Sequence, residues 1–129
     1  MKQAKTWWAK IFVGRRNSDT GRIVPVKRLT DLIQKITDNG GLCVTVEPTR
    51  FFYKDGNEPG LVVGLINYPR FPLSTKKLET QALCLARLLL KVAEQKRLSV
   101  QFPNKTIMLQ DEDAMTGGPL LASAERERA

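Results

Sequence analysis

The sequence predicts an α+β fold: an antiparallel-rich sheet of about five strands with two helices, in the order β-α-β-β-α-β-β. Two segments repeat apolar residues at helical spacing, and five shorter segments between turn residues have the character of strands. Long helices combined with hairpin-linked strands favour helices gathered on one face of a sheet. Apolar residues make up 42% of the 129 residues, which is enough for one core without disulfides or metals.

The first half of the chain predicts a strand, a helix and a second strand. Residues 5–14 (KTWWAKIFVG) are rich in aromatic and β-branched side chains, as in strands. Residues 26–38 place apolar side chains at helical spacing, after Pro25 and before Gly40. Residues 42–53 alternate in polarity, which indicates a half-buried strand, and Pro48 favours an edge position or a bend.

The second half predicts a turn at 54–60, an apolar strand at 61–67 and an extended linker at 68–72. A helix follows, capped by Ser74 or Thr75 and ending near Lys96, and then strands 97–102 and 106–110 form a hairpin. The apolar stripe of this helix is wide, so it is buried either between layers of the fold or in a subunit contact. Residues 1–110 are expected to form one domain, and residues 111–129 a flexible acidic tail.

The charge of the chain points to an anionic partner. The net charge is +8, and the excess of lysine and arginine lies before residue 111. Such a body attracts anions through its summed field, although solubility alone would also explain it. Nucleic acid, a phosphorylated small molecule and an anionic membrane surface are the candidates. The apolar run at 82–93 is too short and too charged to span a bilayer, and no signal peptide is evident, so a cytoplasmic protein is expected.

The sequence contains no histidine, which excludes a Ser-His-Asp triad, a Cys-His pair and histidine-ligated zinc. The acidic residues Glu47 and Glu58 have no evident partner for acid–base chemistry, and Glu58 is expected in a turn. Cys43 and Cys84 are expected to be free thiols. A protein without enzymatic activity, catalytic residues, metal or cofactor is therefore predicted.

Three segments are candidates for ligand binding. The loop at 14–22 combines guanidinium groups with hydroxyls and glycine-permitted turns, which suit phosphate. The segments TRFFY (49–53) and NYPRF (67–71) pair arginine with aromatic rings that could stack on a base or pack in the core. The tip NKT (104–106) could touch phosphate or be an ordinary turn. The candidate residues are Arg15, Arg16, Arg22, Arg28, Phe52, Asn67, Tyr68, Arg70, Phe71, Lys105 and Thr106.

The segments GLCVTVEPTRFFY (41–53), NEPGLVVGLINYPRFP (57–72) and NKTIML (104–109) resemble phage Thoeris anti-defence proteins of the first described type, over roughly residues 7–110. The resemblance implies a sponge, assembled as a dimer or larger oligomer, that sequesters glycocyclic ADP-ribose, the signal made by host TIR-domain enzymes. Some members hold cyclic oligonucleotides in a second site. Matching residue types lie at Asn67, Tyr68, Arg70, Phe71, Lys105 and Thr106, but Lys105 stands where the family has arginine, which weakens a bidentate phosphate contact.

The preferred function from sequence is therefore a non-enzymatic, oligomeric sponge for a nucleotide-type small molecule. One alternative is a basic nucleic-acid-binding module, whose affinity would fall steeply with salt. Another is a protein–protein inhibitor that uses the leucine-rich helix as its interface.

Overall fold

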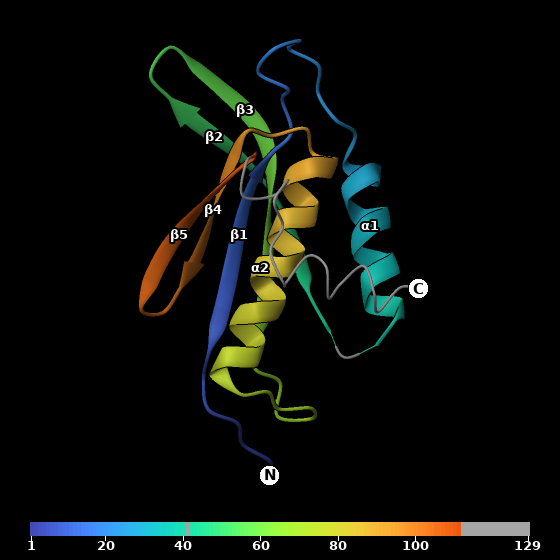
Figure 1. Ribbon diagram of the computed structural model, residues 1–129, viewed down its shortest axis with the longest axis vertical. Coiled ribbons are helices and arrows are strands. Elements are labelled where there is room, and N and C mark those ends of the chain that lie inside the picture. The colour runs from blue at the N-terminus through green and yellow to red at the C-terminus, as the bar shows by residue number, and fades with distance from the viewer. Residues whose placement is uncertain (41, 112–129) are drawn as a thin grey trace.

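The structure, a computed structural model, describes residues 1–40 and 42–111 and has the predicted order of elements. These are β1 (Trp8–Gly14), α1 (Val26–Asp38), β2 (Thr45–Tyr53), β3 (Gly56–Ile66), α2 (Thr75–Val92), β4 (Arg97–Phe102) and β5 (Lys105–Gln110). The five strands form one sheet in the order β2-β3-β1-β4-β5, with every neighbouring pair antiparallel (Figure 1). The predicted α+β class is confirmed. Apart from Asp111, the expected tail at 111–129 lies outside the described residues.

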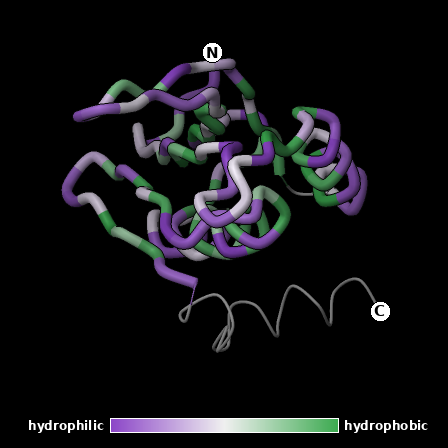
Figure 2. Tube along the Cα trace, turned by 90° about the horizontal axis from the view of Figure 1, so that it is seen from above, coloured by the Kyte–Doolittle hydropathy of each residue, from purple (hydrophilic) through white to green (hydrophobic). Residues whose placement is uncertain are grey.

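Both helices cover the same face of the sheet, and the core lies between them and the strands (Figures 1 and 2). Alternation places Ala9, Ile11 and Val13 of β1 on this face, where each is at most 1% exposed. Register carries the pattern across the sheet, because Ile11 pairs with Val63 on one side and Val100 on the other. The core is therefore centred on β1 and its two neighbours.

The wide apolar stripe of α2 is explained by the layers of the fold. The helix contacts β1 and β4 with one side and α1 with another. Leu90 is fully buried, and Leu83 and Val92 are partly buried against the core. Ser74 caps the helix, because its hydroxyl accepts the N–H of Lys77 at 3.1 Å. Neither helix of the described residues is long and apolar enough to cross a membrane.

The main departure from the predicted boundaries is the β2–β3 hairpin. Residues 56–60, expected in a turn, belong to β3, and only Lys54 and Asp55 form the turn. Asp55 has a positive φ of 62°, which an aspartate in a tight turn tolerates. Pro59 remains compatible with the strand at the register position opposite Arg50. The extended hairpin projects past the end of β1 as a two-stranded arm (Figure 1), and its tip carries the 77% exposed Phe52.

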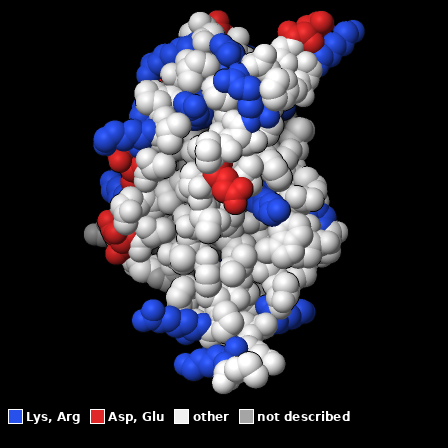
Figure 3. Space-filling model, turned by 180° about the vertical axis from the view of Figure 1, so that it is seen from behind, with Lys and Arg blue, Asp and Glu red and all other residues white. Residues whose placement is uncertain are grey.

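Within residues 1–40 and 42–111, no helix covers the second face of the sheet. Register places Phe12, Val62 and Met108 on it, because Phe12 pairs with Val62 and with Ser99, which in turn pairs with Met108. Trp8 and Ile66 share this face, and Ile66 and Met108 are about half exposed. Figure 3 shows this side of the molecule, with basic groups gathered towards its ends and a middle that is uncharged except for one acidic and one basic group side by side. We call this surface the open face.

Candidate functional site

A cleft of about 520 Å³ lies at the end of the sheet where the arm projects. Three parts of the chain form it: the loop after β1, the arm itself, and the junction between α2 and β4. The volume lies within the usual range for small-molecule sites. Its lining is polar and carries both signs of charge. The lining residues are Arg16, Ser18, Tyr53, Glu58, Glu94, Gln95, Lys96 and Arg97.

The loop after β1 keeps its shape through one asparagine. The Asn17 side-chain oxygen accepts the N–H groups of Asp19 at 2.9 Å and Thr20 at 3.2 Å. The Asn17 backbone N–H donates to the Arg22 carbonyl at 2.8 Å, which closes the loop at its base. This local network is the Asx-turn chemistry expected of asparagine in a loop. It places Arg16 and Ser18 on the wall of the cleft.

Glu58 brings a half-buried carboxylate into the cleft from β3. Its Oε2 atom accepts the backbone N–H of Arg16 at 3.1 Å. Gly14 makes room for it, since a Cβ at position 14 would lie 2.6 Å from Glu58 Oε2 and 2.9 Å from Gln95 Oε1. Among the described residues Glu58 forms no ion pair. The cleft therefore contains a carboxylate whose charge is not compensated within the described chain.

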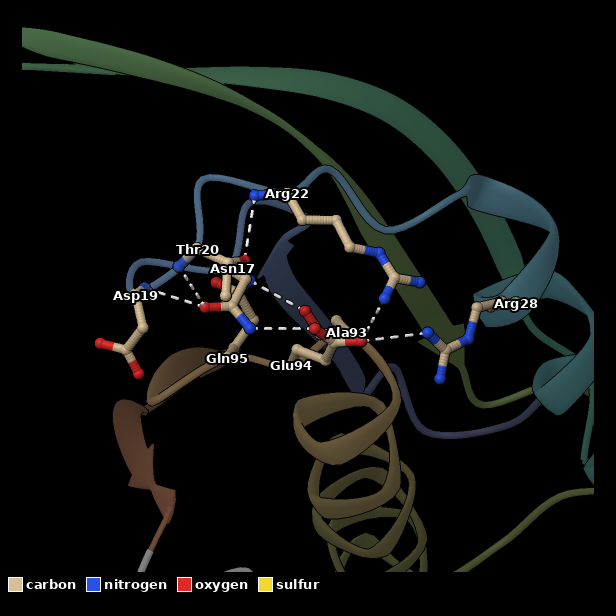
Figure 4. Close-up of polar contacts among 8 residues, drawn as sticks. All are labelled: Asn17, Asp19, Thr20, Arg22, Arg28, Ala93, Glu94 and Gln95. Atoms are coloured by element: carbon tan, nitrogen blue, oxygen red, sulfur yellow. Dashed lines mark hydrogen bonds and ion pairs between the residues drawn. The ribbon is translucent and has the colours of Figure 1, made fainter.

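Glu94 carries the second carboxylate, and it is fully engaged (Figure 4). Its Oε1 accepts Asn17 Nδ2 at 2.9 Å, and its Oε2 lies 3.1 Å from Arg28 Nη1 and 3.9 Å from Arg22 Nη1. The hydrogen bond from Asn17, followed by that from Arg28, holds the pKa of Glu94 below its ordinary value. The residue has a positive φ of 56°, an uncommon backbone conformation for glutamate.

The basic residues of the cleft divide into paired and unpaired groups. Lys96 forms an ion pair with Asp19 at 2.9 Å. Arg16 donates only a long bond, 3.4 Å, from its side chain to the Gly21 carbonyl. Arg97 is exposed and, in the part of the chain that the structure describes, faces no carboxylate partner. Arg16 and Arg97 therefore leave guanidinium groups available to an anionic group of a ligand.

The structure brings together the predicted basic residues of the first loop. Arg16 lines the cleft, while Arg22 and Arg28 contact Glu94 at its edge. Arg15 donates to the Val24 carbonyl at 2.8 Å and so fixes the return of the loop. Phe52 lies at the tip of the arm, largely exposed.

The other predicted residues lie elsewhere in the fold. Tyr68 and Phe71 lie beyond the far end of β3 with ring centroids 5.4 Å apart, beside Cys43. A hydrogen bond with Cys43 raises the pKa of Tyr68. Asn67 donates to the Lys5 carbonyl and accepts the Leu73 N–H, both at 2.8 Å, so its amide holds the linker in place. Arg70 is exposed on the same linker.

At the β4–β5 hairpin, Lys105 pairs with Glu79 of α2 at 2.5 Å, and Thr106 is exposed. The predicted residues thus fall into four separate groups: the first loop with the start of α1, the tip of the arm, the linker at 67–71 and the β4–β5 hairpin. Only the first group adjoins the cleft through the residues that were predicted. Ser18 and Tyr53 lie in the candidate segments 14–22 and 49–53, although neither was among the chosen binding residues, and Glu58 was set aside as a turn residue. The lining residues that the sequence did not indicate are Glu94, Gln95, Lys96 and Arg97. The one available signal was a polar, charged cluster directly after the long helix, at 94–97.

Neither a protein-family model nor a curated protein sequence matches the chain significantly. Two solved structures do match. One is a phage SAM lyase in complex with S-methyl-5′-thioadenosine, with a TM-score of 0.64, 15% identity, and coverage of 87% of this chain and 95% of that one. The other is a phage SAM lyase in the apo state, with a TM-score of 0.59, 16% identity, and coverage of 82% and 90%. At this identity the likeness shows the fold.

These comparisons correct one prediction. A protein without enzymatic activity was predicted from the sequence, but both similar structures are of an enzyme that shares the fold along nearly its whole length. The missing histidine excludes particular mechanisms and not catalysis as such. The first of the two structures is a phage protein that holds a nucleoside, S-methyl-5′-thioadenosine. The comparisons give no Thoeris protein.

Proposed function

We propose that this protein is a lyase that binds S-adenosylmethionine in the cleft and releases S-methyl-5′-thioadenosine. The fold supports this, because it is the fold of a phage SAM lyase solved with that nucleoside. The observation that carries the proposal is the charge of the cleft: the uncompensated carboxylate of Glu58 lies in the same cavity as the unpaired guanidinium groups of Arg16 and Arg97.

S-adenosylmethionine has complementary charges. It carries a cationic sulfonium, an ammonium group and a carboxylate. A carboxylate such as Glu58 attracts the two cationic groups, and a guanidinium fork binds the substrate carboxylate with two parallel hydrogen bonds. Tyr53 offers an aromatic face on which the adenine can stack. Loss of the sulfonium charge on cleavage weakens the attraction to Glu58, which favours release of the neutral thioether.

The chemical step breaks the bond between the sulfonium sulfur and Cγ of the amino-acid part, and its electron pair stays on sulfur. A lyase uses no water, so the carbon fragment must supply the compensating electrons itself. Either its carboxylate oxygen bonds to Cγ and closes a lactone, or a Cβ–H bond gives up its pair to form an alkene and a proton leaves. Neither route needs histidine, and the identity of the fragment tells them apart.

Such an activity fits a phage anti-defence protein. Removal of S-adenosylmethionine deprives restriction–modification enzymes of the molecule that they use as methyl donor. This proposal replaces the sponge, and it keeps the predicted class of partner, a nucleotide-type small molecule. A cytoplasmic site of action would place the enzyme where that substrate is made.

We also propose that the chain forms a homo-oligomer through the open face. Large apolar patches exposed on a soluble protein mark interaction surfaces, and Trp8, Phe12, Val62, Ile66 and Met108 share this face. Light scattering coupled to size exclusion tests this directly. Met108→Glu should shift the mass towards the monomer, and a wild-type protein that is monomeric at micromolar concentration refutes the proposal.

The proposed activity is tested by incubating the purified protein with S-adenosylmethionine and identifying the products by chromatography and mass spectrometry. Glu58→Gln and Arg97→Ala should each lower kcat/KM by about 10- to 100-fold, since a hydrogen bond to a charged group contributes roughly 1.5–3 kcal/mol. Asp38→Asn, a matched charge change at the far end of α1, should leave kcat/KM unchanged.

The same protein is titrated calorimetrically with S-methyl-5′-thioadenosine and with a cyclic ADP-ribose isomer. Binding of the thioether supports the cleft as a nucleoside site. Intact S-adenosylmethionine after incubation, combined with tight binding of the cyclic isomer, would refute the lyase. Cleavage that persists unchanged in Glu58→Gln would refute the role given to this cleft.

A further inference from the structure

In the part of the chain that the structure describes, each hydrogen bond and ion pair between the loop after β1 and the junction of α2 and β4 involves a side chain, including the ion pair of Asp19 with Lys96. Glu94 receives Asn17 from the loop, Arg22 from its end and Arg28 from the first turn of α1. Gln95 adds a bond from its Nε2 to the Arg16 carbonyl at 3.0 Å. Figure 4 shows these groups converging on the end of α2. We call Asn17, Arg22, Arg28 and Glu94 the clamp.

Asn17 connects the clamp to the internal structure of the loop. Its Nδ2 donates to Glu94, while its Oδ1 holds the N–H groups of Asp19 and Thr20. The Asn17 amide therefore links the shape of the loop to its position against α2, beside the Gln95 bond to the Arg16 carbonyl and the ion pair of Lys96 with Asp19. The loop in turn presents the Arg16 backbone N–H to the Glu58 carboxylate at 3.1 Å. Through these bonds, the position of Glu58 depends on the clamp.

The backbone of Glu94 has a left-handed conformation directly after the end of α2. Its φ of 56° is uncommon for a residue with a side chain, whereas glycine adopts this conformation without strain. Such a conformation persists only where surrounding contacts maintain it. Here the end of α2 supplies two of these contacts, because the N–H of Glu94 donates to the Lys91 carbonyl at 3.1 Å and the N–H of Gln95 donates to the Leu90 carbonyl at 3.0 Å. The hydrogen bonds of the carboxylate to Asn17 and Arg28 add to them.

We propose that the clamp is a positioning device for the cleft: Asn17 and Glu94 hold the loop so that Arg16 and Glu58 face the substrate, and Arg22 and Arg28 act only through Glu94. This inference rests on the proposed function and adds residue roles to it. Arg22 and Arg28, predicted from sequence to bind the ligand, are therefore positioning residues. Arg16, Arg97 and Glu58 bind the amino-acid part of the substrate.

The first test measures amide hydrogen exchange in the protein without ligand, resolved by residue. In Glu94→Ala the N–H groups of Arg16, Asp19 and Thr20 keep their own acceptors, so only loss of the clamp can free them. Their exchange should accelerate at least about threefold, the factor that corresponds to the upper part of the range for exposed ion pairs. Glu94→Gln, which keeps an acceptor for Asn17, should show a smaller change.

Lys27→Ala is the matched control. It removes one positive charge beside Arg28, and its ion pair with Asp31 is exposed and separate from the clamp. Exchange in the loop should stay at the wild-type rate. Unchanged exchange in Glu94→Ala would overturn the clamp, whatever the protein binds.

The second test separates positioning from ligand contact with a mutant cycle read by titration with S-methyl-5′-thioadenosine. If Arg22 and Arg28 act only through Glu94, the triple variant with all three changed to alanine should bind no more weakly than Glu94→Ala alone. With S-adenosylmethionine as substrate, Asn17→Ala and Glu94→Ala should raise KM several-fold and leave kcat within about twofold. Additive losses of affinity, or a fall in kcat at unchanged KM, would overturn the positioning role. Absence of binding by the wild type would count against the proposed function and not against the exchange result.

Discussion

Substitution of Gly14 tests the geometry of the cleft, because its effect on activity can be compared directly with its effect on the stability of the fold. A Cβ added at this position would lie 2.6 Å from Glu58 Oε2 and 2.9 Å from Gln95 Oε1. Both distances are too short, so Gly14→Ala must push these two groups away. Both belong to the ends of flexible side chains, and the backbone of β1 has no need to move.

The magnitude follows from these two displacements. An off-rotamer side chain costs about 0.5–1.5 kcal/mol, so moving two of them costs about 1–3 kcal/mol. Replacing glycine by alanine inside a strand returns about 0.5–1 kcal/mol. The net loss of stability is therefore expected to be about 0–2.5 kcal/mol. Because Glu58 leaves its place beside the Arg16 N–H, activity should fall about as far as in Glu58→Gln.

Gly64→Ala is the matched control. There the added Cβ would meet Thr45 Oγ1 at 2.8 Å, also a side-chain atom in the same sheet but outside the cleft. By the same arithmetic Gly64→Ala displaces one side chain, so its effect in urea unfolding should lie between a gain of about 0.5 kcal/mol and a loss of about 1 kcal/mol. Cleavage of S-adenosylmethionine should fall only in Gly14→Ala. Equal activity in the two variants would refute the assignment of Glu58 to the substrate site.

Three further predictions concern the fold and the clamp. Leu89→Ala, at a fully buried position of α2, should lower the free energy of unfolding by about 2–5 kcal/mol in urea titration, and a loss below 1 kcal/mol would contradict the core described above. Ser74→Ala should cost about 0.5–2 kcal/mol because the Lys77 N–H loses its acceptor, whereas Ser74→Asp should retain most of the stability. Because the pKa of Glu94 is lowered, the carboxylate stabilises the fold above its ordinary pKa of 4.5, and this contribution is lost as the pH falls through the lowered value. In thermal unfolding from pH 7 to pH 2, the melting temperature should therefore fall less in Glu94→Gln than in the wild type. Parallel curves for the two proteins would show that the carboxylate contributes nothing to stability.

Local patterns were sufficient to predict the class and order of the elements. The helical spacing of Val26, Leu29 and Ile33 predicted α1 with its observed boundaries. The same reasoning predicted a strand shorter than β3, because residues 56–60 contain glycine and proline, which are typical of turns. Their strand conformation comes from pairing with β2 on one side, such as Arg50 opposite Pro59, which only the folded hairpin supplies.

The site was harder to predict because its contacts join distant parts of the chain. Glu94 lies 77 residues from Asn17 and 66 from Arg28 in sequence. The sequence shows the arginines of the first loop but not the carboxylates with which they form ion pairs, so all of them were candidates for anion binding. The fold neutralises Arg22 and Arg28 with Glu94 and leaves Arg16 without a carboxylate partner.

What matters for ligand binding in the cleft is therefore not the number of charged side chains, but that some of them have no ion-pair partner in the described chain. A carboxylate that is already bonded to two guanidinium groups offers little to a ligand, because any new contact must replace an existing one. Glu58 has no such partner in the described chain, although it is half-buried and fixed by the Arg16 N–H. A charged group that is held in place without a counter-ion is one that a substrate can satisfy. This is why a chain with a net charge of +8 is expected to recognise its substrate partly through an acidic residue.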